Sequence, residues 1–379
     1  METKLVAEMA DQTVYEGEGG AYYAWTPSKS PLLSEYKLGA SKLLLHPLGF
    51  VFPHFFDSSK IGYVLQGSCT IGLVTPNTSE ETVVVIKKGD VIPFPRGLIS
   101  WWFNGGDTDF TLIFLGETAK AQVAGEMGYF FLAGAVGFLR GFGSDVVANL
   151  FDLNNKEAEQ LISSQPAEFI VKLGNGTEFP SPSEGVKGKV YAAIDTPEAD
   201  VVVKGGGIIN SVTETEFPVL AGMGLSAKFV RLEGKAMLAP SYVADGTGRV
   251  IYVTKGSGRI RVVGNEGKPS FDGDVAEGEL MVVPQFLAAA VIADEGGMEL
   301  FSIINASNFV FLAKFPMIIS MGLEFIFDRP TFEQLAANMS IWKVLPSVVL
   351  RSALNISPEF EQLFKSKNAD CLMIIPPRN

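Results

Sequence analysis

Two stretches of the sequence share one pattern and decide the fold: Ile61-Gly-Tyr-Val-Leu-Gln-Gly67 and Val250-Ile-Tyr-Val-Thr-Lys-Gly256. Each contains Tyr-Val-x-x-Gly, and the second lies 252 − 63 = 189 positions after the first. Another pair, Gly89-Asp-Val-Ile-Pro-Phe-Pro95 and Gly278-Glu-Leu-Met-Val-Val-Pro284, is separated by the same 189 positions. Because one offset relates both pairs, the sequence indicates a tandem duplication with halves of about 190 residues.

Within each half, short runs rich in Val, Ile, Phe and Leu are separated by Gly, Asp and Pro. Examples are Thr82–Ile86 and Phe110–Phe114 in the first half, and Ser257–Val263 and Leu300–Ile304 in the second. This spacing is typical of an antiparallel sandwich or barrel. We therefore expect an all-β core in each half.

Helical signals follow each predicted barrel. They lie at Asp152–Ile162, where Asn154 or Asn155 can cap a helix, at Pro346–Leu354, and at Ser357–Phe364, which begins Ser-Pro. The stretch 174–189 is rich in Gly, Pro, Ser and Glu and is interpreted as a linker. The expected domains are an N-terminal barrel with its helical extension over 15–173, the linker over 174–189, and a C-terminal barrel with its extension over 190–373.

The composition favours a folded chain and excludes some partners. Of the 379 residues, 47% are hydrophobic, and 30 basic against 42 acidic side chains leave a formal net charge of −12. Without a block of Lys or Arg, the chain has no footprint for a phosphate backbone, so we expect no nucleic acid partner. Acidic residues near the N-terminus (Glu2, Glu8 and Asp11) interrupt any secretory signal, so we expect a cytoplasmic location.

One apolar run extends from Phe309 to Phe327 and contains Lys314, Pro316 and Glu324. A membrane-spanning helix tolerates these residues poorly, so we expect no membrane partner. A buried or interface-forming helix is the preferred interpretation, with Phe315–Phe327 suited to burial between subunits.

A motif in the first half suggests a family. The stretch from Gly89 to Asn104 has the spacing of the second cupin motif, G-x5-P-x-G-x2-H-x3-N, with Ser100 in place of the histidine. With Phe131-Leu-Ala-Gly134, Phe217-Pro-Val-Leu220 and Tyr252–Gly258, the chain resembles the plant bicupins of the 11S globulin or legumin-like family, above all the cytosolic glutelin type-D-like branch. The resemblance implies tandem cupin barrels (jelly-roll, double-stranded β-helix) with helical extensions, and a homo-trimer.

The resemblance also identifies the positions that correspond to the metal ligands of metal-dependent cupins. In this sequence other residue types occupy those positions. Counting back from Gly67 places Pro53 and Phe55 at the paired histidine positions and Lys60 at the glutamate position. In the second half the glutamate is replaced by Arg249 and the motif-two histidine by Ala289. His54 lies one residue out of this register and is expected to face away from the pocket. We expect no metal and no cofactor.

The residues at these positions are the candidates for a ligand pocket: Phe55, Lys60, Tyr63, Ser100, Trp102, Ser241, Arg249, Tyr252 and Ala289. Lys60 and Arg249 are expected to be solvated charges at the barrel mouths, with attraction of an anion as the alternative. Alternation along the predicted strand places Ser100 and Trp102 on one face. Trp102 is expected to fill the core, with stacking on a flat ligand as the alternative.

Three functions stay open at this point. The first is a storage-globulin-like nutrient reservoir without catalysis, and the second is binding of a small apolar or anionic ligand. The third is a metal-independent enzyme of plant specialised metabolism, an isomerase, lyase or cyclase acting on an apolar small molecule. Its candidate catalytic residues are Lys60, Ser100 and Tyr63.

Overall fold

The structure is a computed structural model that describes residues 5–75, 80–244, 248–305, 332–336, 340–367 and 372–377. The chain forms two compact units. The first comprises Ala10–Ala193 and Glu216–Met223, and the second comprises Met1–Met9, Ile194–Thr215 and Gly224–Asn379. The apolar run from Phe309 to Phe327, for which a buried or interface-forming helix is predicted, lies outside the described residues.

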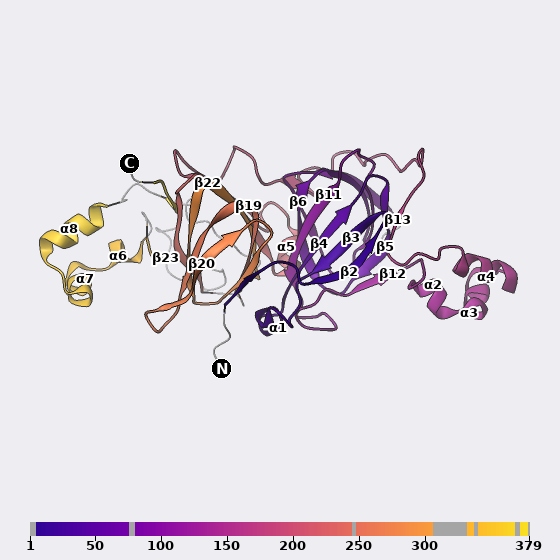
Figure 1. The fold of residues 1–379 in the computed structure, drawn as a ribbon, viewed down its shortest axis with the longest axis horizontal. Helices are drawn as coiled ribbons and strands as arrows, with labels where there is room; N and C mark the ends of the chain where they lie inside the picture. Colours follow the sequence, from indigo (N-terminus) through magenta and orange to yellow (C-terminus); the bar gives the residue numbers. More distant parts are fainter. Residues whose placement is uncertain are drawn as a thin grey trace. The chain divides into compact units, whose positions relative to one another are not determined.

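Two antiparallel sheets build the barrel of the first unit, called here the first barrel (Figure 1). One sheet has the order β14-β9-β6-β11-β4-β3-β2, with β2 Gln12–Gly17, β3 Gly20–Ala24, β4 Leu38–Leu45, β6 Ser59–Gln66, β9 Asp90–Phe94, β11 Phe110–Glu117 and β14 Ala192–Ala193. The other has the order β12-β5-β10-β7-β8 with β13 beside β5, namely β5 Gly49–Phe56, β7 Ser68–Val74, β8 Glu81–Lys87, β10 Ile99–Phe103, β12 Tyr129–Phe131 and β13 Ile170–Lys172. Their apolar faces share one core.

One sheet builds the second barrel. Its main path has the order β1-β21-β19-β22-β17-β16-β15, and β18, β20, β23 and β24 pair beside it. The bounds are β1 Ala7–Glu8, β15 Val201–Val203, β16 Gly207–Val212, β17 Ser226–Leu232, β18 Met237–Val243, β19 Gly248–Val263, β20 Pro269–Ala276, β21 Leu280–Pro284, β22 Ala288–Ile304, β23 Phe332–Gln334 and β24 Ile374–Ile375. The four strand runs predicted from the sequence all lie in strands, so the expectation of all-β cores is confirmed.

The described helices are short and mostly follow the barrels. Their bounds are α1 Pro31–Glu35, α2 Phe138–Phe142, α3 Ser144–Phe151, α4 Asn155–Ser163, α5 Val219–Met223, α6 Ile341–Val344, α7 Ser347–Leu354 and α8 Pro358–Ser366. Figure 1 shows α2, α3 and α4 grouped together after β12, and their contact is a small apolar cluster around Val147 and Ala158. Within the described part of the chain, no helix is both long and apolar enough to cross a membrane.

Side-chain caps begin two of these helices as predicted. The Asn154 side chain accepts a hydrogen bond from the Glu157 backbone N–H at 3.0 Å, and the Glu157 carboxylate accepts one from the Asn154 N–H at 2.9 Å. This reciprocal capping box satisfies two donors at the start of α4. At α8, Ser357 accepts a hydrogen bond from the Phe360 N–H at 3.2 Å, with proline next in the chain.

The duplication is visible in the backbone. Gly67 and Gly256 have φ angles of +73° and +75°. The carbonyl of Gly67 accepts a hydrogen bond from the backbone N–H of the residue before Gly89, and the carbonyl of Gly256 accepts one from the residue before Gly278, at 3.0 and 2.9 Å. Since both positions need a left-handed conformation, glycine recurs there in both halves.

The segment 174–189, predicted as a linker, lies in the first unit. Its Phe179 stacks on Phe103 with ring centroids 4.0 Å apart, and the Ser183 N–H donates to the Val83 carbonyl at 2.8 Å. The segment therefore packs along β8 and β10 of the first barrel.

The close fit at Gly256 makes a testable prediction. A Cβ there would lie 2.3 Å from the Gly297 carbonyl oxygen, whereas Gly267, at a φ of +71°, has no atom within 4 Å of its Cβ position. We expect Gly267→Ala to lower the free energy of unfolding by about 1 kcal/mol through backbone strain alone. Gly256→Ala adds a clash with backbone and should cost about 3 kcal/mol or more. Urea denaturation of both variants checks this, and equal losses would contradict it.

Candidate functional site

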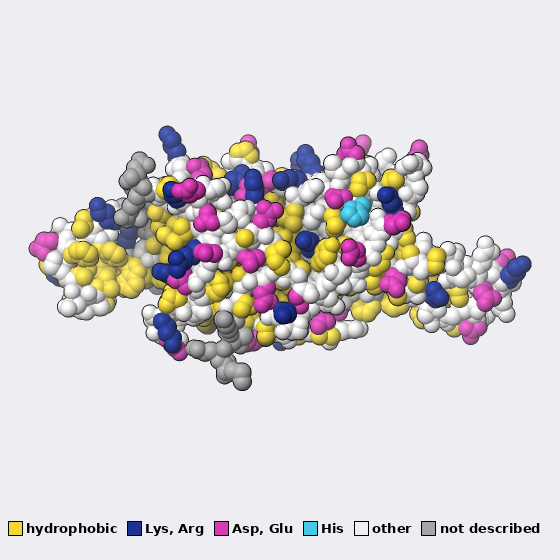
Figure 2. Space-filling model, viewed as in Figure 1, with side chains coloured by type: hydrophobic (Ala, Val, Ile, Leu, Met, Phe, Trp, Pro, Cys, Tyr) yellow, Lys and Arg dark blue, Asp and Glu magenta, His cyan; other side chains and the backbone are white. Residues whose placement is uncertain are grey.

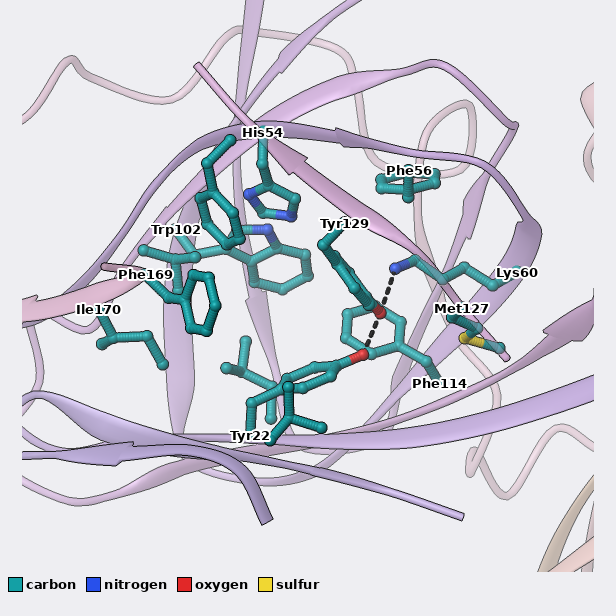
Figure 3. Close-up of a pocket in the computed structure, with 14 residues that line it drawn as sticks. Tyr22, His54, Phe56, Lys60, Trp102, Phe114, Met127, Tyr129, Phe169 and Ile170 are labelled. Atoms are coloured by element: carbon teal, nitrogen blue, oxygen red, sulfur yellow. Dashed lines mark hydrogen bonds between the residues drawn. The ribbon is translucent and has the colours of Figure 1, made fainter. Parts of the chain in front are cut away.

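A cavity of about 180 Å³ lies inside the first barrel. Side chains from both sheets line it, mostly aromatic and aliphatic, and its polar groups come from Tyr22, His54, Lys60 and Tyr129. Figure 3 shows these groups facing one another across the space, with Trp102 behind His54 and Phe114 below Tyr129. We call this space the first-barrel cavity.

Strand pairing decides which residues of β5 reach the cavity. On β10, Ser100 pairs with His54 and Trp102 pairs with Val51, so two steps on β10 match three on β5. This irregularity is a β-bulge, which changes which residues of a strand share a face. As a result Val51, His54 and Phe56 all line the cavity.

His54 therefore faces the cavity, and the expectation that it faces away is wrong. The register taken from the family motif places Phe55 inward, five positions before Lys60, but the residue of β5 that lines the cavity next to Lys60 is Phe56, four positions before it. Phe55 instead stacks on Phe130 with ring centroids 5.1 Å apart and does not line the cavity.

Lys60, on β6, is the central polar residue of the cavity. It is only 1% exposed, so the expectation of a solvated charge at the barrel mouth is wrong. Its Nζ donates a hydrogen bond to the Tyr129 hydroxyl at 2.7 Å. The same nitrogen lies 4.0, 4.3 and 4.1 Å from the ring centroids of Phe56, Phe114 and Tyr129. Inward alternation on β6, between strands β9 and β11, places this long side chain in the core.

Burial lowers the pKa of Lys60 well below its usual value, and the nearby carboxylate of Asp57 opposes that shift. A ring face favours a desolvated ammonium by roughly 2 kcal/mol, so the three rings oppose part of the shift. Removing an ammonium from water costs several kcal/mol or more. The desolvation cost determines the direction of the shift, and the amine loses its proton more easily than a surface lysine.

A short chain of hydroxyls leads from Lys60 on β6 to Tyr129 on β12 of the other sheet, and from there back to β3 and β4 of the sheet that holds Lys60. The Tyr129 hydroxyl contacts that of Tyr22 (Figure 3). Tyr22 in turn contacts the Ser41 hydroxyl. Burial raises the pKa of Tyr129 to about 12, and burial also raises that of Tyr22 well above its usual value. Both tyrosines are therefore neutral donors and acceptors at physiological pH.

His54 is a neutral imidazole. Its Nδ1 lies 2.8 Å from the Phe52 carbonyl oxygen. Since a carbonyl only accepts, Nδ1 carries the proton and Nε2 is left with a lone pair. Burial is the main cause of a fall in the pKa of His54 to about 3, with a smaller contribution from the charge of Lys60.

The structure brings only part of the predicted site together. Lys60 and Trp102 line the cavity. Ser100 lies on the same face as Trp102, as expected, but its hydroxyl accepts a hydrogen bond from Trp102 Nε1 at 3.1 Å and is not part of the cavity wall. Tyr63 is buried in β6 outside the cavity. Ser100 thus orients the indole, and the three candidate catalytic residues do not converge.

Tyr22 and Tyr129 line the cavity but are not predicted from the sequence. Tyr129 belongs to the apolar stretch Gly128–Gly134, and β12 reaches the cavity by pairing with β5 more than seventy positions away. No local pattern marks that pairing. For Tyr22, the available signal was the alternation of side chains along β3. Because Tyr22 and Tyr23 are adjacent, the sequence did not determine which of the two faces inward.

The predicted residues of the second barrel are buried, and none of them lines the first-barrel cavity. They are Ser241 on β18, Arg249 and Tyr252 on β19, and Ala289 on β22. Arg249 is 4% exposed, so its expected place as a solvated charge is also wrong. Burial, and then the charge of Arg249, lower the pKa of the neighbouring Lys228 to about 7.

No metal site is found in the described ranges, where no three His, Cys, Asp or Glu side chains gather. Asp57, whose charge acts on Lys60 and Tyr129, accepts hydrogen bonds from the Gln122 and Gly128 backbone at 3.0 and 2.9 Å. The cavity therefore offers an amine, two hydroxyls and one imidazole nitrogen in aromatic surroundings, a donor set suited to a small organic molecule.

The fold is that of solved seed globulins. The crystal structure of the coconut allergen cocosin matches with a TM-score of 0.86 and 24% identity, covering 99% of both chains. Procruciferin, an 11S globulin from Brassica napus, matches with a TM-score of 0.85 and 22% identity over 99% of this chain and 97% of its own. A structure of an 11S globulin from Wrightia tinctoria, described as revealing an auxin binding site, matches with a TM-score of 0.83 and 20% identity over 96% and 93%.

Similar sequences come from the same group of proteins. Cocosin 1 of Cocos nucifera is 24% identical over 88% of this chain and 80% of its own. Glutelin type-D 1 of Oryza sativa subsp. japonica is 22% identical over 88% and 79%, and a 12S seed storage protein of Arabidopsis thaliana is 25% identical over 77% of each. The cupin family model matches residues 7–159 and 192–317, one match for each half of the repeat. The chain is a bicupin and belongs to the cupin family.

Proposed function

We propose that this protein is a nutrient-reservoir protein of the storage-globulin kind. The observation that carries the proposal is that seed storage proteins match most of its length, 88% for cocosin 1 and 77% for the 12S seed storage protein. The incomplete convergence of Lys60, Ser100 and Tyr63 gives the enzyme alternative no assembled site. A reservoir protein needs only a compact, stable chain that accumulates. We propose that it accumulates in the cytoplasm.

Storage predicts a characteristic time course. We expect the protein to accumulate during seed maturation to a visible fraction of total seed protein, and to fall at least tenfold during germination as it is degraded. Quantitative immunoblotting across both stages, with a housekeeping enzyme of constant level as the control, measures this. A constant low level in leaves and seeds would contradict the proposal.

We further propose that the chain assembles as a homo-trimer through its helical extensions. Figure 2 shows hydrophobic side chains gathered over α7 and α8. On the first extension Leu150 and Phe151 are 64% and 55% exposed, and on the second Val344 and Val348 are 75% and 65% exposed. Apolar patches of this kind are rare on monomers and are stabilised when another subunit covers them.

Charged substitutions on the extensions test the trimer. We expect sedimentation equilibrium at micromolar concentration to give three times the mass of one chain. Leu150→Lys and Val348→Lys should each weaken self-association at least tenfold, because a charge cannot be buried at the interface without cost. Val202→Lys is the matched control, since Val202 is 59% exposed on a strand instead of an extension helix. A wild-type monomer would exclude this assembly.

A second function is supported by the first-barrel cavity: binding of a small aromatic ligand with an acceptor group. A cavity of about 180 Å³ exceeds the roughly 150 Å³ that is enough to hold a benzene-sized ring. Its wall is mostly apolar, and its amine and hydroxyls lie together near Tyr129. An aromatic carboxylate fits this arrangement, with its ring among the aromatic side chains and its oxygens on Lys60 and the tyrosines.

Benzoate is a suitable probe. Because burial lowers the pKa of Lys60, a bound carboxylate should favour the ammonium, and binding should be accompanied by proton uptake wherever the free amine is uncharged. Calorimetry in buffers of different ionisation enthalpy measures the uptake. Val51→Phe, which fills the cavity, should weaken binding at least tenfold, whereas Val85→Phe on the exposed face of β8 should not. Equal binding by both variants would exclude the cavity as the site.

A further inference from the structure

We propose that Lys60 captures small aromatic aldehydes as a covalent imine inside the first-barrel cavity. The proposal rests on the ligand-binding role of that cavity and adds a reaction to it. An aldehyde carbonyl is an acceptor of the same size as a carboxylate but can form a bond to an amine nitrogen. Among the described residues of the cavity wall, Lys60 supplies the amine, at a place where a ring-sized molecule fits.

The position of the amine is the first support. Lys60 is 1% exposed, and Figure 3 shows its Nζ directed toward the Tyr129 hydroxyl and the interior of the cavity. Phe56, Phe114 and Tyr129 surround the nitrogen at 4.0 to 4.3 Å from their ring centroids. An aldehyde ring that packs among these side chains brings its carbonyl carbon within reach of the nitrogen. Aromatic walls also exclude the water that hydrolyses an imine.

The charge state of the amine is the second support. Only an uncharged amine attacks a carbonyl, and a lysine desolvated in an apolar pocket is an activated nucleophile. The titratable groups that face Lys60 are Tyr22, His54 and Tyr129, and all three are neutral at physiological pH. The carboxylate of Asp57 favours the ammonium, but burial is the larger effect on the pKa of Lys60.

Tyr129 supplies the proton transfers. The Nζ lone pair forms a bond to the carbonyl carbon, and the carbonyl oxygen takes the proton of the Tyr129 hydroxyl, which lies 2.7 Å from the attacking nitrogen. The nitrogen then returns a proton to Tyr129, which leaves a neutral carbinolamine. Loss of its hydroxyl with another proton from Tyr129 releases one water, and the nitrogen again returns a proton. One aldehyde and one amine thus give one imine and one water, without oxidation or reduction.

Lys228 provides an internal comparison. It is also buried, at 3% exposed on β17, and burial with the charge of Arg249 lowers its pKa to about 7. Low basicity alone would predict labelling of both lysines. Access through the cavity predicts labelling of Lys60 alone, because the described wall of the first-barrel cavity contains Lys60 and not Lys228.

Reductive trapping tests the proposal on the full-length protein. Benzaldehyde is added near pH 8, sodium borohydride reduces the imine to a stable secondary amine, and peptide mass spectrometry locates the benzyl group. We expect Lys60 to be labelled at least tenfold faster than any surface lysine. Labelling of Lys60 should decrease on acidification as its amine gains a proton. Equal labelling of all lysines, or labelling of Lys228 in place of Lys60, would overturn the proposal.

Variants separate chemistry from folding. Lys60→Met should abolish the label at this position, but this change alone does not show where the aldehyde binds. Val51→Phe keeps the amine and fills the cavity, so it should reduce labelling at least tenfold, and Val85→Phe should leave it unchanged. Tyr129→Phe should slow labelling at least tenfold. Its circular dichroism and unfolding midpoint, and those of Val51→Phe, identify any loss due to misfolding.

The benzoate experiment distinguishes the two levels of the proposal. Excess benzoate should protect Lys60 from benzaldehyde, because both occupy the same space. If benzoate binds with proton uptake but Lys60 is never labelled, the covalent reaction is wrong and the ligand-binding role stands. If neither compound binds, the ligand-binding role itself is wrong.

Discussion

The register of β5 against β10 is the constraint on which the first-barrel cavity depends. Side chains alternate along a strand, so a shift of one residue exchanges the inward and outward faces. Because of the bulge between Val51 and His54, an odd-numbered and an even-numbered residue of the same strand both face the cavity. β12 and β13 pair with the same strand, so the positions of Tyr129 and Ile170 in the cavity wall follow from β5 as well.

The buried lysine shows how packing sets chemistry. In water the amine of Lys60 would be protonated and solvated. At the expected barrel mouth it would also be surrounded by solvent. Inside the barrel it has three ring faces and one phenol as neighbours, which stabilise an ammonium less than water does. The fold therefore makes Lys60 a weaker base than an exposed lysine, and this property supports both proton uptake with an acid and bond formation with an aldehyde.

The two halves keep one backbone and differ in their interiors. The positive-φ glycines and the hydrogen bonds around them recur at the offset of 189 positions, because the turn geometry admits little else. At the same offset Lys60 corresponds to Arg249 and Ser100 to Ala289, and His54 corresponds to a valine. Both halves bury a basic side chain at this position, but in the described part of the chain only Lys60 lines a cavity together with two tyrosines. A duplicated fold thus leaves each interior free to diverge.

Sequence alone was sufficient for the duplication, the β character of both cores, the caps of α4 and α8, and the resemblance to the cupins. These features depend on local patterns: glycine where φ is positive, alternation within a strand, and Asn or Ser before a helix. It also predicted that Ser100 and Trp102 share a face. The depth of Lys60, the inward direction of His54 and the presence of Tyr129 were decided only by the tertiary structure. Each depends on a bulge, a turn length or a strand pairing between distant segments, and a one-residue change in any of these moves a side chain from solvent to cavity.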